Sequence, residues 1–173
     1  SIDNWKRSEG EIEDLFNLLA LWIKTDAPWL NEQGVRLCHL GRLRLIPEIL
    51  QNAITHAVRL TSKNGGMTLN LAFNYTGRAD ITDAVRRIIT DGPPILACID
   101  EGFIASYLST GGIPDVDLVI RTAGEVRLSN FLLWQSAYAE YYFTPVLWPD
   151  FTVEELEKAL KEYNERQRRF GGD

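Results

Sequence analysis

The sequence has 173 residues, 45% of them hydrophobic, which suits one compact domain with a full core. Its formal net charge of −6 argues against a broad nucleic-acid-binding surface, so an anionic ligand must be held by a local group of arginines. No apolar run approaches the ~20 residues that span a bilayer. Cys38 and Cys98 match no metal or redox spacing and are interpreted as buried thiols in a reducing cytosol, which predicts a cytoplasmic location.

The first predicted element is a helix. Ser8 and Glu11 have the spacing of a capping box, and Pro28 is expected to kink or end the helix. Its apolar residues recur at helical spacing on one face, as Ile12, Leu15, Phe16, Leu19 and Ile23.

Strands and helices then alternate. Four short apolar runs predict strands, at 35–40, 67–73, 117–120 and 141–143. Helices are predicted to open at Pro47, after Arg78, near Asp100 and, through a second capping box, at Thr152, the last running to about Arg169. This alternation predicts an α/β fold, a single domain over residues 1–173 with a mainly parallel central sheet flanked by helices. Ligands bind outside the carboxyl ends of such strands.

Residues 117–131 (DLVIRTAGEVRLSNF) lead from a buried strand directly into polar side chains. Arg121, Arg127 and Ser129 could hold a group with several anionic oxygens, because guanidinium groups match phosphate geometry. A helix starting near Ser129 would add its backbone amides. Glu125 is expected to orient one of the arginines, or to hold a metal or water. The alternative is a loop held by surface ion pairs, each contributing about 0–1 kcal/mol.

Glu140 lies among aromatic and small residues in AYAEYYF. An isolated carboxylate is costly to bury, so it needs a cation. Mg²⁺ shared with a diphosphate is one solution, and a salt bridge to an arginine is the other. His39 and His56 are interpreted as structural, and the terminal arginines 166, 168 and 169 suit the last turn of a helix.

Four stretches together resemble the cis-prenyltransferases, the undecaprenyl diphosphate synthase family. They are SIDNWKR (1–7), LNLAFNYTGRADI (69–81), RTAGEVRLSNFLLWQSAYAEYYFTPVLWPDF (121–151) and RRFGG (168–172). The resemblance covers the chain from end to end, and its longest motif is highly specific. It implies an enzyme that condenses isopentenyl diphosphate in cis with an allylic diphosphate, such as farnesyl diphosphate, to give a polyprenyl diphosphate such as undecaprenyl diphosphate.

The resemblance also implies site residues. Arg121, Arg127 and Ser129 would hold the diphosphate of the isopentenyl unit, and Glu140 would help to bind Mg²⁺. The arginines would position the second substrate and take no covalent part in the reaction.

A second implied group lies at the start of the chain. Asn4, Trp5 and Arg7 would lie beside the reacting centre as catalytic residues. Ser1, in the same element, would contact substrate.

The end of the chain and the apolar elements have implied roles as well. Arg169 and Gly171 would reach across a homodimer to the partner's diphosphate site. The helix face at 12–23 and the strands at 35–40 and 67–73 would wall a tunnel for the growing isoprenoid. The lipid product leaves open a peripheral contact with a membrane, and no nucleic acid is implied.

The sequence departs from the family pattern. The family's N-terminal Asp-Gly-Asn-Gly-Arg segment, which cradles the allylic diphosphate, is absent, and we expect the natural protein to carry it upstream of Ser1. Smaller departures are Asp3, Thr76 and Ala123, at positions where Glu, Gly, and Ser or Gly are usual.

Two other functions stay open. The first is a non-catalytic partner subunit of a cis-prenyltransferase, a class that also lacks the N-terminal segment but tends to lose the substrate arginines. The second is a plain diphosphate-binding domain. The intact Arg121, Glu125, Arg127 and Ser129 favour the enzyme.

Overall fold

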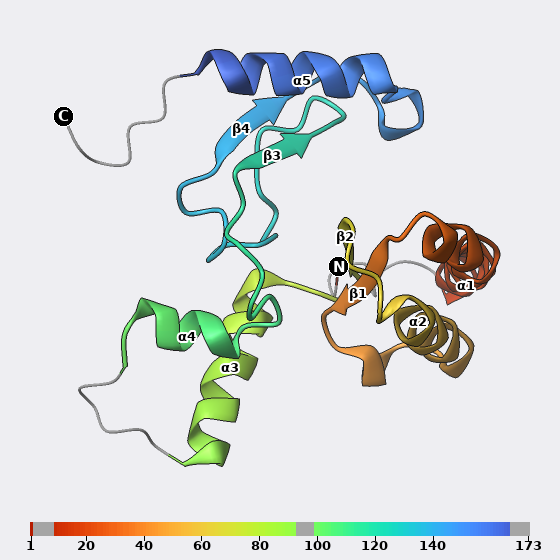
Figure 1. Ribbon diagram of the computed structural model, residues 1–173, viewed down its shortest axis with the longest axis vertical. Coiled ribbons are helices and arrows are strands. Elements are labelled where there is room, and N and C mark those ends of the chain that lie inside the picture. The colour runs from red at the N-terminus through yellow and green to blue at the C-terminus, as the bar shows by residue number, and fades with distance from the viewer. Residues whose placement is uncertain (2–8, 93–98, 167–173) are drawn as a thin grey trace. The chain divides into compact units, whose positions relative to one another are not determined.

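The computed structural model describes residue 1 and residues 9–92 and 99–166. The chain divides into two compact units, Ser1–Asp80 and Ile81–Asp173 (Figure 1). The predicted α/β class with parallel strands is confirmed. That residues 1–173 form a single domain stays a prediction. No helix among the described residues is long and apolar enough to span a membrane.

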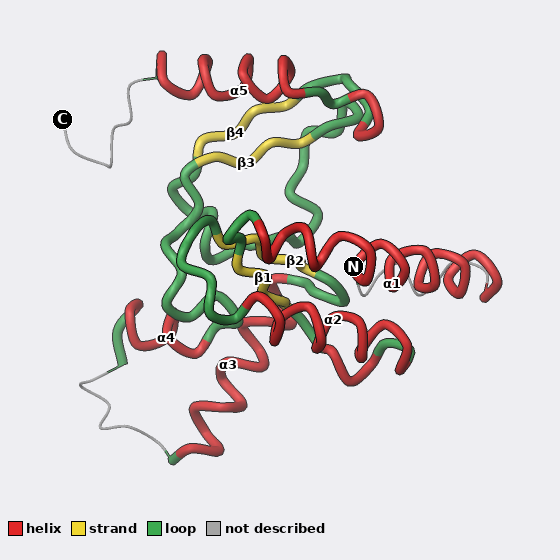
Figure 2. Tube along the Cα trace, turned by 45° about the vertical axis from the view of Figure 1, so that its right-hand side comes forward, coloured by secondary structure: helices red, strands yellow, loops and turns green. Residues whose placement is uncertain are grey.

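The first unit holds two helices against a parallel pair of strands (Figure 2). Its elements in chain order are α1 (Glu9–Glu32), β1 (Arg36–Leu40), the 3₁₀-helix η2 (Leu43–Leu45), α2 (Glu48–Thr61) and β2 (Thr68–Ala72). Arg36 pairs with Thr68 and Leu40 with Ala72, so the two strands end together at their carboxyl ends. This is the parallel pairing that the alternation of strands and helices predicted.

The core of the first unit lies between α1 and α2. Phe16, Ala20, Ile23 and Ala27 of α1 are buried, and their spacing of four, three and four residues forms one helical face. They pack with Leu37 and with the buried face of α2, Leu50, Ala53, Ile54 and Ala57. One sequence expectation fails in α1. Leu15, assigned to the buried face, is 46% exposed, because that face is turned toward Ala20 and Ala27.

Pro28, expected to kink or end the helix, does not end it. It lies inside α1, which continues to Glu32 instead of ending at the proline. A proline inside a helix removes one backbone hydrogen bond. Here the neighbours on both sides, Ala27 and Leu30, pack in or against the core, and this tertiary packing keeps the last turn helical.

Thr61 joins the end of α2 to β1. Its hydroxyl donates to the carbonyl of Ala57 at 2.9 Å and accepts the backbone N–H of Leu37 at 2.9 Å. Thr61 is fully buried, so both bonds are made away from water. The hydroxyl therefore satisfies a strand amide and fixes the position of α2 along β1.

Gly41 closes the carboxyl end of β1. Its φ of +120° lies in the region that favours glycine, and a Cβ there would lie 2.4 Å from the carbonyl oxygen of Phe73. The close approach lets Arg42 N donate to Asn74 O at 3.2 Å, while Asn74 Nδ2 donates to Arg42 O at 2.9 Å. The segments that follow β1 and β2 are thereby held together.

Helix α3 (Gly77–Asp91) starts in the first unit and continues into the second. The hydroxyl of Thr76 accepts the backbone N–H of Ala79 at 3.3 Å, which is the contact of an N-cap. Tyr75 donates through its hydroxyl to Asp80 at 3.1 Å, and both side chains are buried. The threonine that replaces the usual glycine thus helps to begin this helix.

The second unit contains α4 (Glu101–Tyr107), β3 (Leu118–Arg121), β4 (Glu140–Phe143), the 3₁₀-helix η4 (Trp148–Asp150) and α5 (Val153–Glu165). Helix α4 begins as predicted at Asp100, whose Oδ1 accepts the N–H of Phe103 at 2.7 Å. Helix α5 ends at Glu165, because Arg166 has extended backbone angles, so the predicted helical end near Arg169 is wrong.

Candidate functional site

The candidate site is built on the parallel pair β3–β4. Leu118 pairs with Glu140 and Arg121 with Phe143, so Arg121 occupies the carboxyl end of its strand. Asp117 O accepts the backbone N–H of Glu140 at 2.9 Å and Arg121 O accepts that of Thr144 at 2.9 Å, which extends the pairing at both ends. The strand–loop junction that the sequence selected therefore lies at the edge where α/β proteins bind ligands.

The loop after β3 is tied to the segment after β4. Ala123 N donates to Val146 O at 2.8 Å, and Gly124 N donates to Thr144 O at 2.9 Å. Ala123 has a φ of +66° and Gly124 a φ of +68°, both in the left-handed region. A non-glycine residue is uncommon there, and the two hydrogen bonds hold Ala123 in place. They fix the direction in which the chain leaves Arg121.

The helix expected near Ser129 does not form. Ser129, Asn130 and Leu132 have φ values of +49°, +62° and +44°, and the segment through Tyr138 is a series of turns. Left-handed residues interrupt a right-handed helix, so no helix begins near Ser129. Ser129 itself is exposed, and its contribution would have to come from its hydroxyl or its own backbone.

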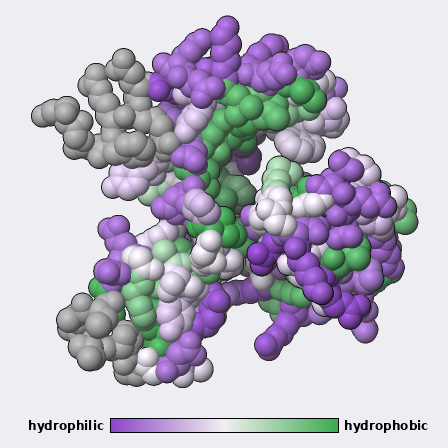
Figure 3. Space-filling view, in the orientation of Figure 1, coloured by the Kyte–Doolittle hydropathy of each residue, from purple (hydrophilic) through white to green (hydrophobic). Residues whose placement is uncertain are grey.

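An apolar cavity of about 510 Å³ lies beside this loop. Its size falls in the range of small-molecule sites, roughly 300–1,000 Å³. Figure 3 shows hydrophobic surface over the β3–β4 pair, beneath the hydrophilic helix α5. The lining residues are Val116, Leu118, Val119, Ile120, Arg121, Thr122, Ala123, Arg127, Leu128, Phe131 and Leu132. The lining is therefore mainly apolar, with Arg121 and Arg127 among the lining residues.

The two arginines differ in their surroundings. The Arg127 side chain is 64% exposed and forms an ion pair with Glu125, which agrees with the expectation that Glu125 contacts one of the arginines. Arg121 is half-buried, and within the described residues its guanidinium makes no hydrogen bond or ion pair. A guanidinium carries five N–H donors and no acceptor. Arg121 is therefore a cavity-lining residue whose donors have no partner among the described residues.

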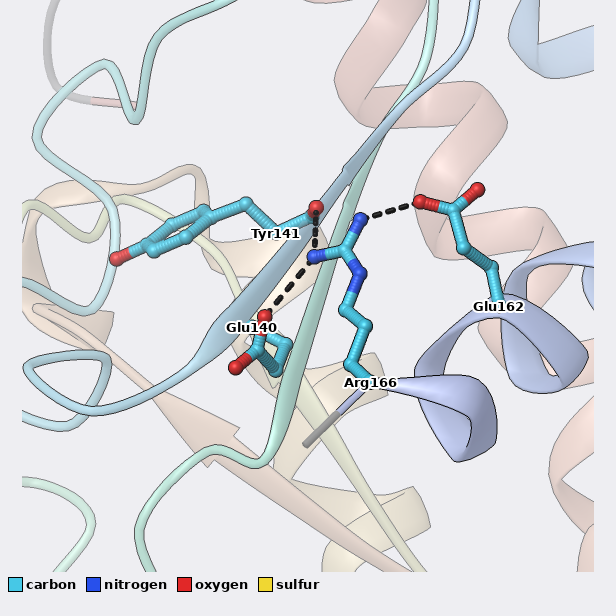
Figure 4. A network of polar contacts seen from close by, with 4 residues as sticks. All are labelled: Glu140, Tyr141, Glu162 and Arg166. Atoms are coloured by element: carbon cyan, nitrogen blue, oxygen red, sulfur yellow. Dashed lines mark hydrogen bonds and ion pairs between the residues drawn. The ribbon is translucent and has the colours of Figure 1, made fainter. Parts of the chain in front are cut away.

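Glu140 has the salt bridge that the sequence left open as one alternative. Arg166 Nη1 donates to Glu140 Oε2 at 2.9 Å and to Tyr141 O at 2.9 Å, and Arg166 Nη2 binds Glu162 (Figure 4). These partners raise the pKa of Arg166, through the hydrogen bond to Glu162 first and that to Glu140 second. Glu140 does not line the cavity next to Arg121.

Glu140 could still ligate a cation through its second oxygen. Oε1 makes no hydrogen bond among the described residues. No group of three His, Cys, Asp or Glu side chains in the described part of the chain could hold a metal by itself. A Mg²⁺ at Glu140 would thus take most of its ligands from substrate oxygens and water, which is the usual manner of this ion. The donor set fits such a supporting role.

Several predicted site residues lie outside the described residues, namely Asn4, Trp5, Arg7, Arg169 and Gly171. Ser1 is described and exposed. Their roles stay predictions.

Three other predictions concern residues of the first unit. Cys38, expected to be buried, is only half-buried, whereas Cys98 is outside the described residues. His39 is structural as predicted: its Nε2–H donates to Phe73 O at 3.0 Å, and burial lowers the pKa of the imidazole. Of the residues proposed to line a tunnel, Val35 is buried but Met67 is 65% exposed.

Arg166 is the residue that sequence reasoning missed. It was assigned to the helix end on the basis of the helix dipole alone. Its spacing of four residues from Glu162 was a usable signal for one of its contacts. Its contact with Glu140 joins residues 26 apart and could not be obtained from local spacing.

Parallel strands that end in a basic loop beside an apolar cavity define an α/β protein suited to a ligand with an anionic and an apolar part. The comparison with known sequences gives the family. The model of the family described as "Putative undecaprenyl diphosphate synthase" matches residues 1–171. The chain belongs to this family of prenyltransferases.

Relatives of known name support the assignment. An isoprenyl transferase of Streptococcus pyogenes serotype M3 (strain ATCC BAA-595 / MGAS315) is 47% identical over 178 residues, which cover 99% of this chain and 72% of the relative. Among solved structures, the lavandulyl diphosphate synthase from Lavandula x intermedia, in complex with dimethylallyl diphosphate, has a TM-score of 0.93 and 38% identity, and the match covers 98% of this chain and 75% of that one.

A second solved structure has the same fold. A probable undecaprenyl diphosphate synthase from Campylobacter jejuni has a TM-score of 0.89 and 34% identity, with 98% of this chain and 79% of that chain covered. Prenyl transfer is therefore the activity of the class to which this chain belongs.

Proposed function

We propose that the protein condenses isopentenyl diphosphate in cis with an allylic diphosphate such as farnesyl diphosphate. The product would be a polyprenyl diphosphate such as undecaprenyl diphosphate. The observation that carries the proposal is Arg121, a half-buried residue that lines an apolar cavity and whose guanidinium makes no hydrogen bond or ion pair with the described residues. An isoprenoid diphosphate has the two parts that such a site can bind, a charged head and a hydrocarbon tail.

The arginine loop would bind and orient the diphosphate of the isopentenyl unit. Arg121 is the last residue of β3, and the backbone bonds at Ala123 and Gly124 hold the loop that follows it. On ligand binding, Arg127 would either leave Glu125 and bind the diphosphate, or bind both groups. Guanidinium groups bind phosphate oxygens bidentately, which fixes the direction of the attached carbon chain. The apolar wall, including Leu128 and Phe131, would exclude water from that chain.

The reaction needs no protein nucleophile. The double bond of the isopentenyl unit forms a carbon–carbon bond to C1 of the allylic substrate, while the C1–O bond breaks and diphosphate leaves. Loss of a proton from the added unit then restores an alkene, so atoms and charge balance. The arginines contribute by positioning the reacting carbon and by stabilising negative charge.

The proposal includes Mg²⁺, with Glu140 as one of its protein ligands. The open Oε1 of Glu140 supports this role. When bound, the ion supplies positive charge that stabilises the departing diphosphate. Asn4, Trp5, Arg7 and Ser1 are proposed to lie by the reacting centre.

The remaining proposals concern the assembly and the location of the protein. Arg169 and Gly171 are proposed to complete the site across a homodimer. A cytoplasmic location, with at most peripheral contact with a membrane through the lipid product, is part of the same proposal.

The decisive experiment incubates the full-length protein alone with radiolabelled isopentenyl diphosphate, farnesyl diphosphate and Mg²⁺. Products are separated by reverse-phase chromatography. Chain elongation without another protein is the expected result. Elongation only after a second subunit is added would support the partner-subunit alternative. Diphosphate binding with no elongation under either condition would support a plain binding domain, and both of these outcomes would overturn the proposal.

A further inference from the structure

Arg166 connects three acceptors at the point where helix α5 ends. Its Nη1 donates to Glu140 Oε2 and to Tyr141 O, both at 2.9 Å, and its Nη2 binds Glu162 one turn back along α5 (Figure 4). The side chains of Arg166 and Glu140 are 32% and 28% exposed, so the pair is shielded from much of the solvent. Arg166 thereby links the start of β4 to the end of α5.

The geometry fixes one face of the Glu140 carboxylate. Because Nη1 binds Oε2 and the backbone carbonyl of Tyr141 together, the carboxylate is held relative to the β4 backbone itself. Glu162 holds the other end of the guanidinium plane and limits its rotation. Oε1 is left without a hydrogen bond among the described residues. Oε2 is thus held by Arg166, and Oε1 remains available for a ligand.

We infer that Arg166 is a positioning residue for cation binding: it orients Glu140 so that Oε1 can ligate a divalent metal carried by a diphosphate. The inference rests on the proposed function, in which Glu140 is a metal ligand. Hydrogen-bonding partners of a ligating carboxylate set its orientation, and their loss typically costs about 10–100-fold in metal affinity. Arg166 does not contact the metal or the substrate in this arrangement.

The separation of the acceptors favours an arginine. The planar guanidinium offers donors in a rigid fork, so one group can serve Glu140, Tyr141 O and Glu162 at once. A lysine would keep the charge but would offer a single flexible nitrogen. A simple ion pair would need only the charge, whereas the positioning role needs the fork.

The test measures binding of Mn²⁺, in the presence of inorganic diphosphate, to the full-length protein by electron paramagnetic resonance. The variants are R166Q, R166K and E140Q, with thermal unfolding recorded for each. K158M is the matched control, because Lys158 forms an exposed ion pair with Glu155 on the same helix. We expect E140Q and R166Q to weaken Mn²⁺ binding by about 10-fold or more, R166K to be intermediate, and K158M to match the wild type.

The outcomes separate the hypothesis that Glu140 is a metal ligand from the hypothesis that Arg166 positions it. Unchanged Mn²⁺ binding in E140Q would remove Glu140 from the metal site and overturn that part of the proposed function, and this inference with it. Weaker binding in E140Q with wild-type binding in R166Q would overturn only the role of Arg166, as would an equal loss in K158M. If R166Q does not fold, R166K decides: a dissociation constant above the wild-type value supports the inference, and an equal one overturns it.

Discussion

Arg121 and Glu140 lie at opposite ends of the β3–β4 pair. Glu140 is opposite Leu118, the first residue of β3, whereas Arg121 is its last residue and is opposite Phe143. Three residues of parallel strand rise about 10 Å. The diphosphate-binding and metal-binding proposals therefore concern two separate positions on one strand pair, and they can be tested by separate substitutions.

Replacing Arg121 or Arg127 with alanine is expected to impair use of isopentenyl diphosphate more than allylic substrate binding. Hydrogen bonds to charged groups contribute about 1.5–3 kcal/mol, so R121A should raise the KM for isopentenyl diphosphate by about 10–100-fold. The effect of R127A should be smaller, because Arg127 is largely exposed and paired with Glu125. Steady-state kinetics with each substrate varied in turn measures both effects.

Arg86 is the matched control for these variants. It is an exposed arginine of α3 in an ion pair with Asp83, so R86A should leave both KM values unchanged. Equal losses for the two diphosphates in R121A would mean that the loop serves a different substrate from the one assigned.

Thr61 is expected to be important for the stability of the first unit. T61V keeps the shape of the side chain but leaves the buried N–H of Leu37 and the carbonyl of Ala57 without the hydroxyl. An unsatisfied buried group costs about 1–3 kcal/mol, and the free energy of unfolding should fall by that amount. Urea denaturation followed by circular dichroism measures it. T61S, which keeps the hydroxyl, should lose clearly less, and a T61V as stable as T61S would refute the role of the hydroxyl.

Gly41→Ala is expected to destabilise the protein by more than 1 kcal/mol. The new Cβ would lie 2.4 Å from Phe73 O and 2.9 Å from Asn74 O, both backbone atoms, and φ is +120°. Gly10→Ala is the control, because nothing lies within 4 Å of its added Cβ and the residue is helical. This control should be neutral or slightly stabilising. Similar unfolding midpoints for the two variants would mean that the turn after β1 tolerates a side chain.

His39 is expected to make the protein less stable in acid. Burial lowers the pKa of the imidazole below its ordinary value of 6.5, against a smaller opposite effect of the bond to Phe73 O. The unfolded chain then binds more protons than the folded one, so stability is full above pH 6.5 and is lost as the pH falls through the lower folded value.

The H39Q variant tests this pH dependence. Glutamine has no titrating group, so the loss of unfolding free energy between pH 7.5 and pH 5 should be smaller in H39Q than in the wild type. Urea titrations at a series of pH values give the comparison. Parallel curves for the two proteins would assign the acid sensitivity to other groups.

Much of the local structure could be predicted from the sequence. The strands at 36–40, 68–72, 118–121 and 140–143 lie within one residue of the predicted runs, and Asp100 begins its helix as expected. The spacing of apolar residues and the capping of helices depend on neighbours in the chain, so both can be recognised from the sequence alone. The helix expected near Ser129 does not form because left-handed backbone interrupts it, and α1 continues past Pro28.

The sequence by itself determined the order of the elements, the polar composition of the loop after β3 and the resemblance to the family that the comparisons confirm. Only the tertiary structure decided that Arg121 lines an apolar cavity, without a side-chain partner in the described part of the chain, and that Glu140 is anchored by Arg166. The physical reason is the distance along the chain over which each interaction acts. Periodicity and capping act over a few residues, whereas the partner of a charged side chain is chosen by how distant segments pack, and that choice leaves no local pattern to read.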